Sequence, residues 1–175
     1  MYAGLAAYYL IRDENDTGVE PNPIGLPGGE FEMPIVIQDR TFTGAGQLFY
    51  PGPGWVPEFF GDTIVVNGAP FPFLDVEPRK YRFRFLNGSN SRFYHLGIAG
   101  GPPFHHIGSE GGMFDVPIQT SRILMLPAER ADVIVDFAGF EGQDLVLKNA
   151  KLPSGVISPA SVSYTHLTLP TIYSV

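Results

Sequence analysis

The sequence contains no cysteine, and this absence removes several kinds of site at once. Without a thiol the chain can form no disulfide, no iron–sulfur cluster, no thiolate zinc site and no cysteine nucleophile. A blue-copper centre is excluded as well, because such a centre takes a cysteine thiolate together with two histidines. Any metal or redox chemistry at these residues would have to depend on other ligands.

Charged residues are also few, and positive ones are the scarcer kind. They make up 17% of the 175 residues, with 11 basic against 18 acidic side chains and a net charge of −7. A nucleic-acid-binding domain normally shows the opposite balance, so we expect no nucleic-acid partner. The most apolar run, Met1–Ile11, is too short to span a membrane and lacks the basic start of a signal peptide.

Glycine and proline, in contrast, are abundant, with 21 and 17 residues. They cut the chain into short segments, which argues against a helical bundle, while a hydrophobic content of 44% can supply a core. Short strand-forming runs recur about every ten residues with turn signals between them, and this pattern predicts an all-β sandwich or barrel. The expected strands are residues 8–11, 35–37, 63–66, 81–85, 92–98, 104–107, 123–126, 133–137 and 145–147.

Three further features follow from the local pattern. Tyr81–Phe85 alternates without error, so its aromatic side chains should face a core and its arginines solvent or a neighbouring domain. We expect Tyr8–Ile11 to be a buried strand and residues 13–30, rich in proline and glycine, to be a linker. Arg130 and Asp132 flank a strand start and are candidates for a structural ion pair.

The histidines are the candidate metal ligands to weigh, because metal sites often use histidine. His105 and His106 are adjacent, and neighbouring residues of a strand point to opposite faces, so the two cannot easily hold one ion. His95 lies between Tyr94 and Leu96, which favours a packed or hydrogen-bonded side chain. We therefore assign no metal ligand, and a histidine-only metal site is left as an alternative for copper titration to test.

Other catalytic arrangements are equally absent from the pattern. Glu58, Asp62, Asp75 and Glu77 lie in or near loops, where a solvated charge is expected rather than a facing pair of catalytic carboxylates. No serine lies in a G-x-S-x-G motif, and Gly108–Gly112 is rich in glycine but does not open a helix as a phosphate loop would. We therefore expect no catalytic and no cofactor-binding residue.

Aromatic residues in one loop leave a second class of function open. Trp55, Tyr50 and Phe49 could stack on a sugar or an aromatic ligand, although packing in a core or interface is favoured. The alternative function is thus a stand-alone β-sandwich module that binds carbohydrate or another ligand. Asn15 and Asn87 begin glycosylation sequons, of which the second is explained by a turn.

The last residues differ in character from the rest. Val162–Thr171 reads VSYTHLTLPT and resembles the translation of a common sequencing adapter, so residues 162–175 are expected to be a scar. The alternative is a natural strand that enters another domain. Excluding the segment removes His166 and leaves three histidines.

Over nearly all of residues 2 to 150 the sequence resembles the bacterial multicopper oxidases of the laccase, spore-coat oxidase and bilirubin oxidase type. The resemblance implies a cupredoxin-like (plastocyanin-like) Greek-key β-sandwich. It rests on long strings: YAGLAAYYLIRDE (Tyr2–Glu14), MPIVIQDRTF (Met33–Phe42), PEFFGDTIVVNGAPFPFLDVEPRKYRFRFLNGSNSRFY (Pro57–Tyr94), FHHIGSEGG (Phe104–Gly112) and LPAERADVIVDF (Leu126–Phe137).

The resemblance also implies a division of the chain. The family builds three cupredoxin-like domains and binds copper in the first and third. By this comparison residues 1–13 are the last strand of a truncated first domain, 14–34 a linker, 35–150 the second domain and 151–161 a linker toward a missing third. The family's H-D-H and H-C-H motifs are both absent, and its pattern places no copper ligand at His95, His105 or His106.

The function implied is that of a bridging domain without copper of its own. Its partners would be the first and third domains of the same parent chain, whose copper couples one-electron oxidation of phenolic, aryl-amine or bilirubin-like donors to the reduction of oxygen to water. The fragment alone is expected to be inactive. The sequence indicates no compartment, and the exported and spore-coat members of the family favour export.

Overall fold

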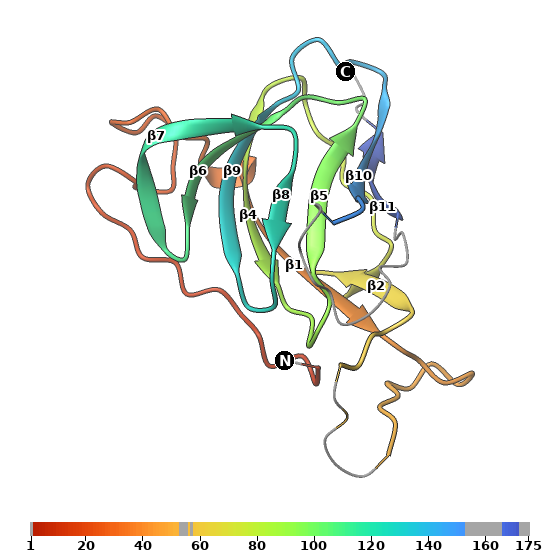
Figure 1. Cartoon of the computed structure of the whole chain (residues 1–175). Coiled ribbons are helices and arrows are strands. Elements are labelled where there is room, and N and C mark those ends of the chain that lie inside the picture. Colours follow the sequence, from red (N-terminus) through yellow and green to blue (C-terminus); the bar gives the residue numbers. More distant parts are fainter. Residues whose placement is uncertain (1, 53–55, 57, 153–165, 172–175) are drawn as a thin grey trace.

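The computed structural model describes residues 2–52, 56, 58–152 and 166–171 (Figure 1). One short 3-10 turn, η1 (Gly29–Phe31), precedes the first strand, and none of the described residues forms a helix that could cross a membrane. The strands are β1 (Glu32–Arg40), β2 (Thr63–Val66), β3 (Ala69–Pro70), β4 (Lys80–Asn87), β5 (Tyr94–Ala99), β6 (Phe104–Ser109), β7 (Gly112–Thr120), β8 (Ile123–Met125), β9 (Arg130–Asp136), β10 (Asp144–Asn149) and β11 (His166–Thr171).

The strands form two sheets that lie one over the other, as Figure 1 shows with β5, β8 and β10 in front of β1, β4 and β9. The larger sheet has seven strands in the order β3-β2-β1-β4-β9-β6-β7, and the smaller has four in the order β11-β10-β5-β8. Neighbouring strands run antiparallel except β1 and β4, which run parallel. The predicted all-β sandwich is confirmed.

The core lies between the sheets and is built by period-two alternation. In β4 the side chains of Tyr81, Phe83 and Phe85 point inward, each no more than 5% exposed, with successive ring centroids 6.1 and 5.9 Å apart. Val133 of β9 is paired with Phe83 and is fully buried. From the opposite sheet Leu96 completes the layer, so the aromatic half of the β4 prediction is confirmed.

Most predicted strands are present, with ends that differ by a few residues. β7 was not predicted, because its side chains are mostly exposed and Pro117 interrupts the strand signal. β11 falls within the segment expected to be a scar, and its backbone pairs antiparallel with β10. The remainder of that segment, residues 162–165 and 172–175, lies outside the described residues.

The prediction of a buried strand at Tyr8–Ile11 is wrong for this chain. These residues form none of the described strands, and the side chains of Tyr9 and Ile11 are 91% and 80% exposed. The reason is that no strand of the described residues offers them a backbone partner. The residues are apolar, as the prediction assumed, but no other part of the described chain covers the side chains of Tyr9 and Ile11.

Candidate functional site

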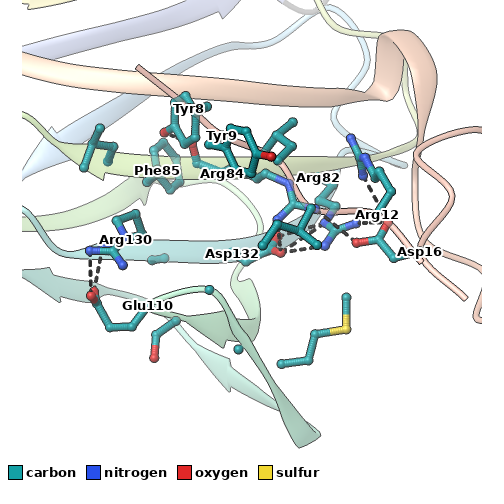
Figure 2. A pocket seen from close by; sticks show the side chains of 18 of the residues that line it. Tyr8, Tyr9, Arg12, Asp16, Arg82, Arg84, Phe85, Glu110, Arg130 and Asp132 are labelled. Carbon is teal, nitrogen blue, oxygen red and sulfur yellow. Dashed lines mark hydrogen bonds and ion pairs between the residues drawn. The ribbon is translucent and has the colours of Figure 1, made fainter. Parts of the chain in front are cut away.

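Six charged side chains gather on the outer face of the larger sheet, beside the N-terminal segment. Figure 2 shows Arg12, Asp16, Arg82, Arg84 and Asp132 among them. Alternation along β4 turns Arg82 and Arg84 to this face because Phe83 and Phe85 occupy the inner one. Strand register supplies the acids: Arg82 lies opposite Glu32 of β1, and Arg84 lies opposite Asp132 of β9. Arg12 and Asp16, from the segment before β1, close over the top.

The distances describe a continuous network, here called the arginine–carboxylate cluster (Arg12, Asp16, Glu32, Arg82, Arg84 and Asp132). Arg82 Nη2 lies 2.6 Å from Asp132 Oδ2, and Arg82 Nη1 lies 2.8 Å from Asp16 Oδ1. Arg84 Nε lies 2.5 Å from Glu32 Oε1, and Arg12 Nη2 lies 2.7 Å from Glu32 Oε2. The Arg82 side chain is entirely buried, so these contacts take the place of the water molecules that would solvate its guanidinium.

The electrostatics follow from burial and pairing together. Burial would raise the pKa of Asp16, but the hydrogen bond and charge of Arg82 outweigh it and hold that pKa below its ordinary value. The same competition, won by Arg12 and Arg84, lowers the pKa of Glu32. Burial would lower the pKa of Arg82, and its hydrogen bonds to Asp132 and Asp16 raise it instead. Pairing therefore holds Asp16, Glu32 and Arg82 in their charged forms.

The contacts of this cluster fit a structural role. Every carboxylate in it is engaged by at least two arginines, so none is free to act as a general acid, a base or a metal ligand. Arg82 and Arg84 were expected to face solvent or a neighbouring domain. Solvent is wrong for Arg82, because Asp16 and Asp132 cover its side chain, and a neighbouring domain on this face stays a prediction. The ion pairs of the cluster attach residues 12–32 to the larger sheet.

Tyr8 extends the clamp along a cavity of about 570 Å³ that borders the cluster (Figure 2). Its hydroxyl donates to the carbonyl oxygen of Ile35 at 3.0 Å and also contacts the carbonyl oxygen of Arg84. Burial is the main cause that raises the pKa of Tyr8, so the phenol stays protonated and acts as a donor. The residue thus ties the N-terminal segment to β1 and β4.

The predicted ion pair between Arg130 and Asp132 is not formed. Asp132 lies directly opposite Arg84 in the sheet and is taken up by the arginines of β4. Arg130 instead contacts Glu110 in the β6–β7 turn, with 2.7 Å between Nη1 and Oε2. Both side chains of this second pair are about half exposed, so the pair contributes little to stability.

The histidines do not come together in a way that fits a copper ion. His105 and His106 occupy successive positions of β6 and so face opposite sides, as predicted. His95 directs Nδ1 to the carbonyl oxygen of Lys151 at 2.7 Å, which agrees with a hydrogen-bonded role. Among the described residues no three histidine, aspartate or glutamate side chains are grouped as a metal site would need.

His106 has a feature that its sequence context did not reveal. Its Nε2 is buried without a hydrogen-bond partner, and its ring meets Phe114 edge-on with centroids 4.8 Å apart. Burial lowers the pKa of His106 and so favours the neutral ring. The side chain is partly buried and packs against Phe114.

The loop candidates are solvated or packed. The carboxylates of Glu58, Asp62, Asp75 and Glu77 are all exposed, as expected for loop charges. Tyr50 packs against the rings of Tyr2 and Phe59, with ring centroids 5.2 and 5.0 Å apart, as the favoured interpretation of this residue expects. Phe49 is 43% exposed, and Trp55 lies outside the described residues.

A second buried polar group holds the turns at the other end of β1. Arg92 Nε lies 2.9 Å from Asp39 Oδ2, and its Nη2 donates to the carbonyl oxygen of Gly61 at 2.7 Å. Asn87 is 1% exposed and donates to the carbonyl oxygens of Arg92 and Met125. The sequon at Asn87 is therefore part of a turn, because its amide is enclosed and already bonded.

Sequence reasoning missed Asp16 and Glu32, which are the two buried carboxylates of the arginine–carboxylate cluster. Asp16 lies in a segment whose proline and glycine content indicates a linker, and nothing in its spacing points to burial. The perfect alternation of Arg82 and Arg84 with core aromatics was the one usable signal. Two arginines on one face of a central strand require carboxylate partners, and only the folded structure shows which carboxylates these are.

Comparison with known proteins shows the family to which this fold belongs. No family model matches the chain. A laccase of Bacillus subtilis is 39% identical over 184 residues, a match that covers 97% of this chain and 35% of the laccase. The chain belongs to the multicopper oxidase family. A bilirubin oxidase of Albifimbria verrucaria is 36% identical over 156 residues, covering 85% of the chain and 26% of that enzyme.

Solved multicopper oxidase structures support the same family. The 2F4 variant of the McoA multicopper oxidase from Aquifex aeolicus superimposes with a TM-score of 0.76 and 38% identity, over 93% of this chain and 36% of that one. A multicopper oxidase from Pediococcus acidilactici gives a TM-score of 0.67 and 33% identity, over 85% and 30%. The predicted cupredoxin-like fold is thereby confirmed. The chain spans about a third of the length of the curated relatives it matches.

Proposed function

We propose that this chain is the non-catalytic bridging domain of a longer multicopper oxidase. In this proposal the parent couples one-electron oxidation of phenolic, aryl-amine or bilirubin-like donors to the reduction of oxygen to water. The observation that carries it is the match to a laccase over 97% of this chain but only 35% of the laccase. The remaining two thirds leave room for copper-binding domains.

The absence of a fitting copper site in the described residues supports the bridging role. His95 is engaged by a backbone carbonyl, and His105 and His106 face opposite sides of a sheet. These residues do not fit a copper centre, so copper is assigned to domains of the parent outside this chain. The cupredoxin domains that would flank this one in the parent are its proposed partners.

What this chain contributes is rigidity between those partners. Sites that act together require positions fixed to a fraction of an ångström, and packed strands hold them better than loops. We divide the chain accordingly: residues 1–13 belong to the last strand of the first domain, 14–34 are a connection clamped to the sheet, and 35–150 are the bridging domain. Residues 151–161 lead toward a third domain, and 162–175 are a scar.

The test is to recover the reading frame on both sides of this segment and to express the complete protein. We expect a frame that continues into histidine-rich copper motifs, tightly bound copper, and oxidation of a phenolic dye with consumption of oxygen. The 175-residue chain, assayed in parallel, should leave the dye unchanged. A complete protein without copper or oxidase activity would overturn the proposal.

A further inference from the structure

The sequence contains two Asn-Gly pairs, Asn67–Gly68 and Asn87–Gly88, and the fold places them in opposite surroundings. In such a pair the glycine nitrogen can attack the side-chain Cγ of the asparagine, because glycine has no Cβ to hinder the approach. The glycine N–H gives its proton to solvent as the new bond forms. The bond between Cγ and Nδ2 then breaks, ammonia leaves, and water opens the resulting succinimide to aspartate or isoaspartate.

Asn67 and Gly68 form the tight turn between β2 and β3 at the surface of the larger sheet. Val66 pairs with Ala69, and the φ angles of Asn67 and Gly68 are 48° and 87°, as a two-residue hairpin turn requires. Both turn residues are exposed, and among the described residues no group accepts a hydrogen bond from the Gly68 N–H. Because β3 is only two residues long, the turn can open without disturbing the core.

The side chain of Asn67 clasps the neighbouring strand β1. The Val36 N–H donates to Oδ1 at 2.8 Å, Nδ2 donates to the carbonyl oxygen of Pro34 at 2.9 Å, and the Asn67 N–H donates to the carbonyl oxygen of Val36 at 3.0 Å. The side-chain amide thus extends the ladder beyond its last pair, Ile37 with Val66. Both side-chain bonds are exposed, so water can replace them whenever the turn opens and releases Cγ.

Asn87–Gly88 has the same two residues but neither reacting atom is available. Asn87 is 1% exposed, and its Nδ2 donates to the carbonyl oxygens of Arg92 and Met125 at 2.8 and 3.1 Å. The Gly88 N–H, which would attack, donates to the carbonyl oxygen of Ile37 at 2.7 Å. Releasing both groups requires the turn to leave the interior, which costs far more free energy than opening an exposed hairpin.

We propose that Asn67 is a site of spontaneous deamidation and that the product opens the clasp on β1. Aspartate keeps an acceptor for the Val36 N–H, but it places a negative oxygen where Nδ2 donated to Pro34, so two oxygens then face each other. Isoaspartate adds a methylene group to the backbone and shifts the turn. Asn67 also lines a mostly apolar cavity of about 550 Å³, which would gain a charge in its wall. The inference does not depend on the proposed function.

The test compares the two pairs within one molecule. The purified 175-residue chain is incubated in its native state in mildly alkaline buffer, and peptide mapping by mass spectrometry follows the Asp and isoAsp products. We expect the reaction at Asn67 to be at least about tenfold faster than at Asn87, because only Asn67 becomes accessible by local opening. In concentrated urea the two pairs should react at similar rates. Equal native rates, or a native Asn67 that stays intact while it reacts in urea, would overturn the site.

A second measurement tests the effect of the product on the clasp. Asn67→Asp reproduces the aspartate product, and the matched control is Asn90→Asp, which adds the same charge at an exposed side chain with no hydrogen bond among the described residues. We expect the backbone amides of Val36 and position 67 to exchange hydrogen at least about threefold faster in Asn67→Asp and to be unchanged in Asn90→Asp. Unchanged exchange in both variants would overturn the opening of the clasp.

Discussion

Arg82 of β4 and Asp132 of β9 are diagonal neighbours in the sheet and form a bidentate pair in which the arginine is wholly buried. Asp132 Oδ2 lies 2.6 Å from Nη2 of the guanidinium, and Oδ1 lies 2.9 Å from Nε. Asp16 takes up the third nitrogen at 2.8 Å, so the buried charge keeps its full set of partners. Breaking such a pair on one side leaves a charge that water cannot reach.

The change Asp132→Asn should therefore be strongly destabilising. It keeps the shape of the side chain but removes the charge opposite Arg82 and Arg84, and we expect the free energy of unfolding to fall by about 3 kcal/mol. The measurement is urea unfolding of the purified chain. The matched control is Glu110→Gln, which breaks the half-exposed pair with Arg130 and should change the stability by less than about 0.5 kcal/mol. Equal effects of the two changes would contradict a buried clamp.

Acid should loosen the same clamp. Arginine contacts outweigh burial and hold the pKa values of Asp16 and Glu32 below their ordinary 3.8 and 4.5, so the folded chain binds fewer protons than the unfolded chain at acid pH. Their contribution to stability is complete above about pH 4.5 and is lost as the pH falls through the lowered values. Unfolding midpoints between pH 3 and pH 7 test this. The Glu32→Gln variant should show a shallower acid decline, and an unchanged decline would speak against the assignment.

The contrast between β4 and its partners shows how far sequence reasoning reached. Alternation predicted which side chains of Tyr81–Phe85 enter the core, because period two is a property of the strand alone. The fate of Arg82 depended on Asp132 and Asp16, which lie 50 and 66 positions away in the sequence. Such pairings are set by register and by the path of a connecting segment. No local pattern encodes either one.

Tyr8–Ile11 carries the same lesson from the other direction. Its apolar character predicted a buried strand, but burial requires a covering surface that the described residues do not supply. The resemblance to multicopper oxidases, in contrast, was recognisable because long strings such as Pro57–Tyr94 cover several consecutive strands. Family and fold class could thus be predicted, whereas contacts between distant segments could not.

His106→Leu should make the chain more stable. Nε2 of His106 is buried without a partner, and an unsatisfied buried polar atom costs about 1 kcal/mol or more, which an apolar replacement of similar size relieves. Because burial lowers the pKa of His106 from its ordinary 6.5, the neutral ring of the folded state opposes protonation as the pH falls below that value. The gain in stability should therefore be larger at pH 5 than at pH 7. Thermal unfolding at both values decides it, and a loss of stability at pH 7 would show a missed partner.

Two glycines that look alike in the sequence should respond differently to alanine. A Cβ at Gly61 would lie 2.3 Å from the backbone nitrogen of Arg40, whereas a Cβ at Gly44 would meet nothing within 4 Å. Gly61 also donates to Asp39 and accepts from Arg92, so it cannot move aside without losing both contacts. We expect Gly61→Ala to lower the free energy of unfolding by about 2 kcal/mol and Gly44→Ala to leave it nearly unchanged. Urea unfolding of the two variants provides the comparison, and equal stability would refute the close approach.

Tyr8 and Tyr9 differ by one position and should differ sharply in the effect of losing a hydroxyl. Tyr8→Phe removes the donor to the Ile35 carbonyl oxygen, a contact worth about 1 kcal/mol, whereas Tyr9 is 91% exposed and Tyr9→Phe removes no contact with this domain. Release of the segment should expose the backbone at Arg12, so trypsin should cleave there several-fold faster in Tyr8→Phe than in Tyr9→Phe, because the rate follows local opening. Cleavage is followed by mass spectrometry under native conditions. Equal cleavage rates would mean that Arg12 and its carboxylates hold the segment without help from Tyr8.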